Sequence, residues 1–344
     1  MFRFECDYTE GAHPRILEEL VRTNLEQTPG YGEDGYCEKA RELIREKCNA
    51  PDSDIYFLVG GTQTNATVIS AVLRPHQGVV SASTGHINVH ETGAVEATGH
   101  KVLSIPSEDG KITAEQLDTL CKGHWEDPTY NHMVQPGMVY LSHPTENGTL
   151  YSKHELSDIK SVCNKYSIPL FIDGARMGYG IMSEKSDVTL ADIAEICDVF
   201  YIGGTKQGFL FGEALVISND CIKKDFNYII KRHGALLAKG RLLGIQFKTM
   251  FEEGLYFSLA QQADRYAMQI RRAFESKGIT MFYDSYTNQQ FPVLTQEQYD
   301  KLGEGFASSY WGKTENGEII VRFCTSWATT QEAVEALLDA IKEL

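Results

Sequence analysis

Short apolar runs alternate with helix-like segments along the chain as far as Asn219. Strands that are covered on both faces of a sheet appear as continuous apolar runs, and strands that alternate with helices join into parallel sheets. This alternation predicts an α/β fold with a mostly parallel, doubly wound sheet. The runs that we expect to form its strands are Ile55–Val59, Gly78–Ser83, Lys101–Ile105, Met138–Ser142, Ile168–Ile172, Asp198–Ile202 and Glu213–Ser218.

Two of these expected strands end in residues that can carry chemistry. A glycine-rich turn with Lys206 follows one strand, and Asp173 and Arg176 follow another. Ligands bind such sheets at the carboxyl ends of the strands. A lysine amine there can form a Schiff base with the aldehyde of pyridoxal 5'-phosphate (PLP), and a carboxylate can keep the pyridine nitrogen of PLP protonated. The alternative is a solvated turn lysine and an ordinary turn aspartate.

A second glycine turn follows the run Ile55–Val59 and leads into a helix-like stretch that ends at Leu73. Gly61 and Thr62 stand at this turn. Backbone N–H groups and the N-terminus of a helix favour a phosphate group at such a place. The alternative is a turn that packs tightly for steric reasons, because neither a Walker lysine nor a GxGxxG pattern is present.

The composition excludes several kinds of partner. The chain has 344 residues, and 47 acidic against 32 basic residues give a formal net charge of -15. This charge argues against nucleic acid or an anionic membrane surface, although a local pocket can still bind a small anion. Eight cysteines lie scattered without a CxxC pair, which predicts free thiols in the cytoplasm and no metal site. The sequence also shows no run of signal-peptide or membrane-spanning length.

The pattern changes after Asn219, where helical segments and then short strands predict a smaller α+β domain. We place the large domain at residues 1–245 and the small domain at 246–344, with residues 1–48 packing around the site. The other elements that we expect are helices at 14–25, 37–47, 113–122, 153–166 and 330–344, an exposed loop at 124–135, and strands at 279–283, 291–294 and 319–324.

Five groups of residues resemble the low-specificity L-threonine aldolases, which are PLP-dependent lyases with the aspartate aminotransferase type of fold (fold type I). The resemblance covers most of the large domain. As a set in this order, the groups are far more specific than any one of them. They are Gly11–Pro14 with Tyr31–Asp34, Gly61–Thr62 with Asn65, Gly85–Ile87 with Glu91–Gly93, Pro144–Thr149 with Asp173–Arg176, and Gly203–Lys206.

The resemblance implies roles for the matching residues. The implied catalytic residues are Lys206 as the Schiff-base lysine, Asp173 at the pyridine nitrogen and His86 stacked on the ring. The implied cofactor-binding residues are Gly61, Thr62, His86, Asp173, Arg176, Thr205, Lys206 and, from a neighbouring subunit, Arg232. The implied substrate-binding residues are Cys6, Tyr31, His132, Arg176 and Arg322, and no metal is expected. Arginine suits the substrate carboxylate because its planar fork pairs two N–H groups with two oxygens.

Several of these assignments stay open. Cys6 stands where the family has a serine, and a thiol is a poorer hydrogen-bond partner than a hydroxyl. Lys231 or His233 could replace Arg232 if the alignment slips. The base that removes a hydroxyl proton could be His86, His132 or a water that they hold. The family completes its sites across a dimer interface, so we expect a homodimer or a homotetramer.

The implied reaction is retro-aldol cleavage of a β-hydroxy-α-amino acid, L-threonine or L-allo-threonine, to glycine and an aldehyde. The alternatives on the same scaffold are β-elimination, transamination and hydroxymethyl transfer. A catalytically silent protein of this fold is the remaining alternative. The sequence does not distinguish the preferred amino acid or the threo from the allo form.

Overall fold

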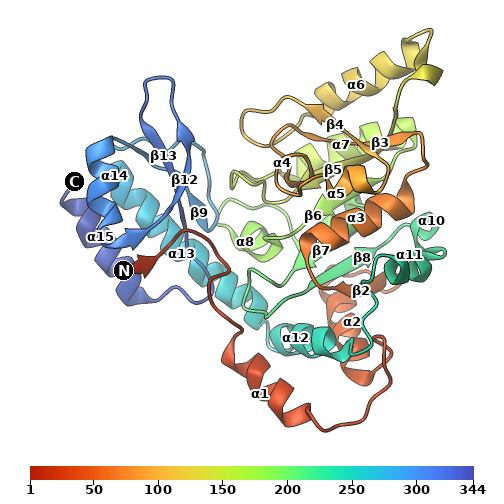
Figure 1. Cartoon of the computed structure of the whole chain (residues 1–344), viewed down its shortest axis with the longest axis horizontal. Coiled ribbons are helices and arrows are strands. Elements are labelled where there is room, and N and C mark those ends of the chain that lie inside the picture. The colour runs from red at the N-terminus through yellow and green to blue at the C-terminus, as the bar shows by residue number, and fades with distance from the viewer.

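The computed structural model describes all 344 residues, and a seven-stranded sheet forms the centre of its larger part (Figure 1). The strand order is β2-β8-β7-β6-β5-β3-β4, and the five strands from β7 to β4 are parallel. The predicted mostly parallel sheet is thus confirmed. The strands are β2 (Asp54–Leu58), β3 (Gln77–Ala82), β4 (Lys101–Ile105), β5 (Gln135–Ser142), β6 (Leu170–Asp173), β7 (Val199–Gly203) and β8 (Glu213–Ile217).

Strand β8 is the exception, because it runs antiparallel to both β7 and β2. A parallel neighbour would need a crossover connection of a dozen or more residues, usually a helix. The short turn between Gly203 and Glu213 cannot supply one, so the chain returns directly along β7. As a result, the first residue of β8 lies at the same edge of the sheet as the last residue of β7, with Gly203 and Glu213 as register partners.

Helices cover both faces of the sheet, which confirms the doubly wound architecture. Side chains alternate between the faces, so Phe200 and Ile202 of β7 join one apolar cluster while Val199 and Tyr201 join the other. The first cluster includes residues of α2 (Gly35–Cys48), α6 (Ala114–Glu126), α7 (Lys153–Tyr166), α9 (Leu190–Ile196) and α12 (Arg241–Glu252). The second includes residues of α3 (Gly61–Val72), α4 (His86–Val89), α5 (Ala94–Ala97), α10 (Asp220–Lys223) and α11 (Phe226–Arg232).

The helix boundaries follow the capping residues of the sequence. Thr113 and Ser152 each form a capping box, with Gln116 and Glu155 respectively, and these caps begin α6 and α7. Helix α1 (Pro14–Thr23) begins with proline at its first position, as predicted, and α2 covers the expected second helix. The predicted loop at 124–135 holds the last turn of α6 and the short helix η1 (Tyr130–His132), and its tip is exposed.

The small domain packs a separate apolar cluster around the long helix α13 (Leu255–Ser276) and strand β13 (Ile319–Cys324). The predicted strand at 279–283 holds only a single bridge between Met281 and Pro292. Strand β12 (Ser309–Lys313) was not predicted, because SYWGK contains no apolar run. The other elements are α8 (Met177–Met182) of the large domain, and β9 (Gln289–Gln290), β10 (Val293–Leu294), α14 (Gln296–Gly303), β11 (Phe306–Ala307) and α15 (Gln331–Lys342) of the small one.

The N-terminal segment belongs to both parts of the molecule. Strand β1 (Phe2–Arg3) pairs with β11, and Phe4 lies in the small-domain cluster, before the chain crosses to α1 on the large domain (Figure 1). Helix α12, in turn, packs with the sheet. The division that we expect between residues 245 and 246 stays a prediction.

Candidate active site

A cavity of about 600 Å³ lies at the carboxyl ends of the central strands and is closed on one side by the small domain. Eight of the residues singled out from the sequence line it together, from segments that are far apart in the chain. They are Gly61, Thr62, His86, Asp173, Arg176, Thr205, Lys206 and Arg322. The sheet topology explains why these residues lie close together, because the residues that follow parallel strands all lie at the same edge of the sheet.

Asp173 ends β6 and is held by four hydrogen-bond donors. Its Oδ1 accepts from the Tyr201 hydroxyl (2.5 Å) and the Ala175 amide (3.0 Å), and its Oδ2 accepts from the Tyr140 hydroxyl (2.6 Å) and the Asn65 side chain (3.0 Å). Burial would raise the pKa of this carboxyl, but the charge of His86 and these donors hold the pKa below its ordinary value. Asp173 is therefore a buried carboxylate.

Lys206 follows β7 in a turn fixed by its backbone. The main-chain oxygen of Lys206 accepts a hydrogen bond of 2.7 Å from the Tyr179 hydroxyl, whereas its amine makes no hydrogen bond and no ion pair. Burial and the charge of Arg176 lower the pKa of the amine, against the opposing charges of Asp7 and Asp173. A lysine amine with a lowered pKa and a free lone pair is suited to attack an aldehyde.

Helix α3 opens toward the cavity at its N-terminus. Its N-cap is Gly60, and no side chain caps the first N–H groups of the helix. Gly60, Gly61 and Thr62 all line the cavity. Uncapped N–H groups and the helix dipole make this end of the cavity a site for an anion such as a phosphate.

His86 is oriented by a carboxylate. Its Nδ1 lies 2.8 Å from Oε1 of the buried Glu91, which also accepts a hydrogen bond of 2.7 Å from Asn65. Because Asn65 also donates to Asp173, one amide connects the two carboxylates. Burial would lower the pKa of His86, but the hydrogen bond to Glu91 and the charge of Asp173 raise the pKa above its ordinary value.

The two arginines of the cavity differ in their partners. Arg176 forms a bidentate ion pair with the buried Asp7, through Nε to Oδ2 (2.7 Å) and a terminal N–H group to Oδ1 (2.9 Å). Arg322, on β13, donates to the main-chain oxygen of Glu5 (2.9 Å) and to the side chain of Gln289 (3.2 Å). Arg322 pairs with no carboxylate, so its charge stays uncompensated.

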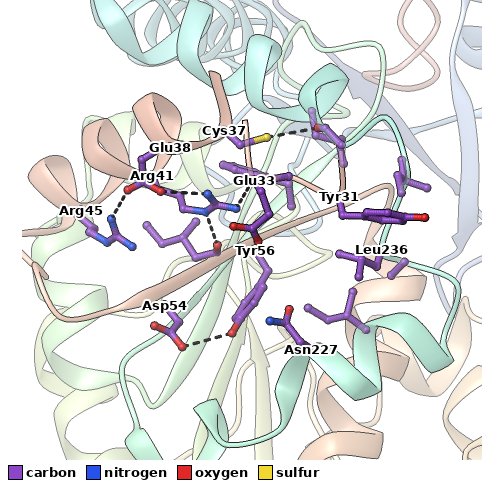
Figure 2. Close-up of a pocket in the computed structure, with 18 residues that line it drawn as sticks. Tyr31, Glu33, Cys37, Glu38, Arg41, Arg45, Asp54, Tyr56, Asn227 and Leu236 are labelled. Carbon is purple, nitrogen blue, oxygen red and sulfur yellow. Dashed lines mark hydrogen bonds and ion pairs between the residues drawn. The ribbon is translucent and has the colours of Figure 1, made fainter. Parts of the chain in front are cut away.

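Four residues singled out from the sequence do not line this cavity, namely Cys6, Tyr31, His132 and Arg232. His132 is exposed on η1 and Arg232 is exposed at the end of α11. Figure 2 shows Tyr31 over a different groove, between α2, β2 and α11, where Tyr56 and Asn227 also lie. Within one chain, these side chains are therefore outside the site.

The structure also adds residues that the sequence analysis missed. Glu213 lines the cavity because β8 runs antiparallel, a direction that no residue pattern revealed. Glu146 accepts hydrogen bonds from the His86 amide (2.9 Å) and the Ser142 hydroxyl (2.6 Å). Trp311 comes from the unpredicted strand β12 and lies 5.0 Å from the guanidinium of Arg322. Only Glu146 carried a usable signal, since it stands in the Pro144–Thr149 group.

The residues present fit PLP. The uncapped end of α3 suits its phosphate, the free amine of Lys206 suits its aldehyde, and the carboxylate of Asp173 suits its pyridine nitrogen. No group of His, Cys, Asp and Glu side chains in the structure could hold a metal ion.

The chain is similar to several known proteins. Residues 7–297 match the family model described as beta-eliminating lyase. A low-specificity L-threonine aldolase of Pseudomonas aeruginosa is 26% identical over 343 residues, which cover 99% of this chain and 97% of that protein. A solved structure of Leishmania major threonine aldolase is 42% identical with a TM-score of 0.96, covering 100% of this chain and 99% of the other. An aspartate aminotransferase of Thermus thermophilus shares the fold alone, at 13% identity and a TM-score of 0.72 over 100% of this chain and 91% of the other.

Proposed function

The chain belongs to the beta-eliminating lyase family, and on this premise we propose that it cleaves L-threonine or L-allo-threonine to glycine and acetaldehyde. The observation that carries the proposal is the meeting of Lys206, Asp173 and Arg322 in one cavity. A carbon–carbon lyase that acts on an amino acid needs a cofactor-binding lysine, an acid for the cofactor ring and a cation for the substrate carboxylate.

We propose PLP as the cofactor. When bound, PLP supplies an aldehyde that condenses with amines and a ring that accepts the electron pair of the bond that breaks. Lys206 would hold the aldehyde end, the N–H groups of Gly61 and Thr62 the phosphate, and Asp173 the pyridine nitrogen. The hydrogen bonds of Asp173 keep its charge in place, and this charge favours a protonated ring nitrogen.

The substrate is oriented by its carboxylate. Arg322 offers a guanidinium without an anionic partner, and Arg176 lies across the same cavity. Fixing the carboxylate fixes the rotation of the amino acid and thereby selects which bond of its α-carbon breaks. Trp311 and the small domain close this side of the cavity and restrict access of water.

His86 is the residue that we propose to move the hydroxyl proton. Its Nδ1 is engaged by Glu91, so Nε2 is the ring nitrogen left to face the substrate hydroxyl. The raised pKa makes His86 a stronger base than an isolated imidazole. His132 is exposed on η1 and would need a neighbouring subunit's cavity to take part.

We also propose a homo-oligomer, a dimer or a tetramer. Leu17, Val21 and Leu25, on and just after α1, expose 45%, 78% and 91% of their surface, which suits a contact with a second copy. Lys231 lies 4.8 Å above the ring of Tyr31, so the end of α11 and the Tyr31 loop form one unit outside the chain's own cavity. We propose that Tyr31 and Arg232 complete the site of a partner chain.

We propose a cytoplasmic location from the cysteines, all eight of which are free. None of the helices in the structure is both long enough and apolar enough to span a membrane.

The test is release of acetaldehyde from L-threonine by the purified protein with added PLP. Lys206→Ala should abolish the release and the borohydride-trapped PLP adduct, while the matched surface variant Lys122→Ala should keep both. Detection of a keto acid in place of acetaldehyde and glycine would contradict the aldol cleavage and indicate β-elimination or transamination. An adduct on another lysine would contradict the role of Lys206.

A further inference from the structure

We propose that Glu213 is the proton acceptor for the Lys206 amine, so that the two side chains hold one proton between them. The proposal rests on the proposed function, since it identifies where the proton of the buried Lys206 goes when the amine reacts. The step is a proton transfer in which one N–H bond of the Lys206 ammonium breaks and an O–H bond forms on Glu213. The charged pair becomes a neutral amine and a neutral carboxylic acid, and no oxidant or reductant takes part.

The strand register places Glu213 between the two halves of the cofactor site. Glu213 pairs with Leu58 of β2 on one side and with Gly203 of β7 on the other. The chain beyond β2 forms the uncapped start of α3, and the chain beyond β7 carries Lys206. Glu213 is only 3% exposed and lines the same cavity.

The carboxyl group is held by the turn that carries the lysine. Its Oε1 accepts a hydrogen bond of 2.9 Å from the Thr205 hydroxyl, and its Oε2 accepts one of 3.3 Å from the Gly204 amide. The Thr205 hydroxyl is itself oriented by the Gly212 amide at 3.1 Å. Thr205, expected to bind the cofactor, therefore has Glu213 as its direct partner.

The charges of three carboxylates, Asp7, Asp173 and Glu213, oppose the lowering of the Lys206 pKa by burial, and only one of them is available as a proton acceptor. Asp173 already accepts two hydrogen bonds on each oxygen, and the proposed function engages it with the pyridine nitrogen of PLP. Asp7 is occupied by the bidentate pair with Arg176 and by Asn288 at 2.9 Å. Glu213 accepts one hydrogen bond on each oxygen and pairs with no cation. It alone keeps a free lone pair on each oxygen.

The charges around Glu213 favour this exchange. The titratable groups that face it are Lys206, Asp173, Tyr201 and Tyr256. Burial, with the charge of Asp173, raises the pKa of Glu213 to about 8, although Lys206 and the Thr205 hydroxyl oppose the shift. Burial also lowers the pKa of Lys206. The Lys206 amine makes no hydrogen bond, so its flexible stem can turn toward Glu213.

The test measures how readily Lys206 reacts as the pH changes in the cofactor-free protein. Reductive methylation with formaldehyde, followed by mass spectrometry of the Lys206 peptide, reports the neutral amine without any need for turnover. We compare wild type with Glu213→Gln, and with Asp264→Asn as a matched control that changes a buried carboxyl outside this cavity.

In Glu213→Gln the pH midpoint of Lys206 reactivity should fall by about one pH unit, because the ammonium loses an anionic neighbour. In wild type the two groups share a proton, so the reactivity of Lys206 should rise with pH in two steps; in Glu213→Gln it should rise in a single step. Asp264→Asn should match wild type. Identical profiles for wild type and Glu213→Gln would overturn the proposal. If Glu213→Gln does not fold, Thr205→Val should shift the midpoint in the same direction by less, and no shift would overturn it. The borohydride adduct and acetaldehyde release are scored separately, so a failed aldolase assay does not decide this result.

Discussion

The cavity holds two arginines in contrasting environments. Arg176, on the large domain, is 11% exposed in its side chain and shares two hydrogen bonds with a completely buried carboxylate, Asp7. Arg322, on the small domain, contacts a main-chain oxygen, an amide side chain and the face of Trp311. Its Nε has no partner.

The difference indicates that the two guanidinium groups have different roles, one in stability and one in substrate binding. The charge of Arg176 is largely cancelled by Asp7, so this pair mainly joins the N-terminal segment to the large domain. The charge of Arg322 is uncompensated, and Arg322 lines the cavity, so we propose Arg322 as the stronger anchor for a substrate carboxylate. The sequence resemblance treats the two residues alike, and only the structure separates them.

The largest expected effect is on stability. Arg176→Ala leaves the Asp7 carboxylate buried without its cation, and this should lower the free energy of unfolding by about 3–5 kcal/mol. Urea denaturation followed by circular dichroism measures the loss. Arg15→Ala, which removes an exposed pair with Glu253, serves as the control and should cost less than about 1 kcal/mol. Equal losses of unfolding free energy in Arg176→Ala and Arg15→Ala would contradict the stabilising role of the Arg176–Asp7 pair.

A second, smaller effect concerns substrate binding. Arg322→Ala should raise the KM for L-threonine about 30- to 160-fold, because charged hydrogen bonds contribute about 2–3 kcal/mol. Its unfolding free energy should change much less than that of Arg176→Ala. Arg322→Lys should restore only part of the affinity, since an ammonium cannot pair with both carboxylate oxygens. Variants in which Arg176 and its partner Asp7 are both replaced by neutral residues provide the comparison. A higher KM in these variants than in Arg322→Ala would contradict our assignment.

The contribution of Asp7 to stability should appear in how the free energy of unfolding depends on pH. Burial would raise the pKa of this carboxyl, but Arg176 and Asn288 hold the pKa below its ordinary value of 3.8. A lowered pKa stabilises the folded state above the ordinary value, and this stability is lost as the pH falls through the folded pKa. Asp7→Asn should therefore remove part of the acid sensitivity, about 1.4 kcal/mol for each unit of pKa difference. Unfolding curves from pH 5 downward that coincide for the two proteins would contradict this.

The smallest effect is expected at Trp311. Its ring lies 5.0 Å from the Arg322 guanidinium, and such a cation–π contact contributes about 0.5–1 kcal/mol. Trp311→Leu should raise the KM about two- to fivefold through a less firmly held Arg322. Trp125→Leu, on the outer part of α6, is the control and should leave the KM unchanged.

The sequence was informative where chemistry follows directly from a strand. Asp173 and Lys206 each come just after an apolar run, so a parallel sheet brings them together without further information. Glu213 could not be found in this way, because its place depends on the reversed direction of β8. Asp7 could not be found in this way either, because its ion-pair partner Arg176 lies far away in the chain. The pattern at this position indicated only the neighbouring Cys6.

The small domain was predicted less well for a related reason. Strand β12 is half-exposed and shows no apolar run, whereas the apolar segment at 279–283 forms only a single bridge. Tyr31, His132 and Arg232 lie outside the cavity of their own chain, and a single sequence carries no signal for contacts between copies.

The pairing of β1 with β11 affects how the protein can fold during synthesis. Phe2 and Phe306 are register partners, so roughly 300 residues must be made between them, which takes tens of seconds at about 5–20 residues per second. Until then Phe2 and Phe4 have no apolar cluster to join, and Asp7 cannot be locked in place by Asn288. The substrate side of the cavity is therefore assembled last, after the large domain has been translated and can already have packed its sheet.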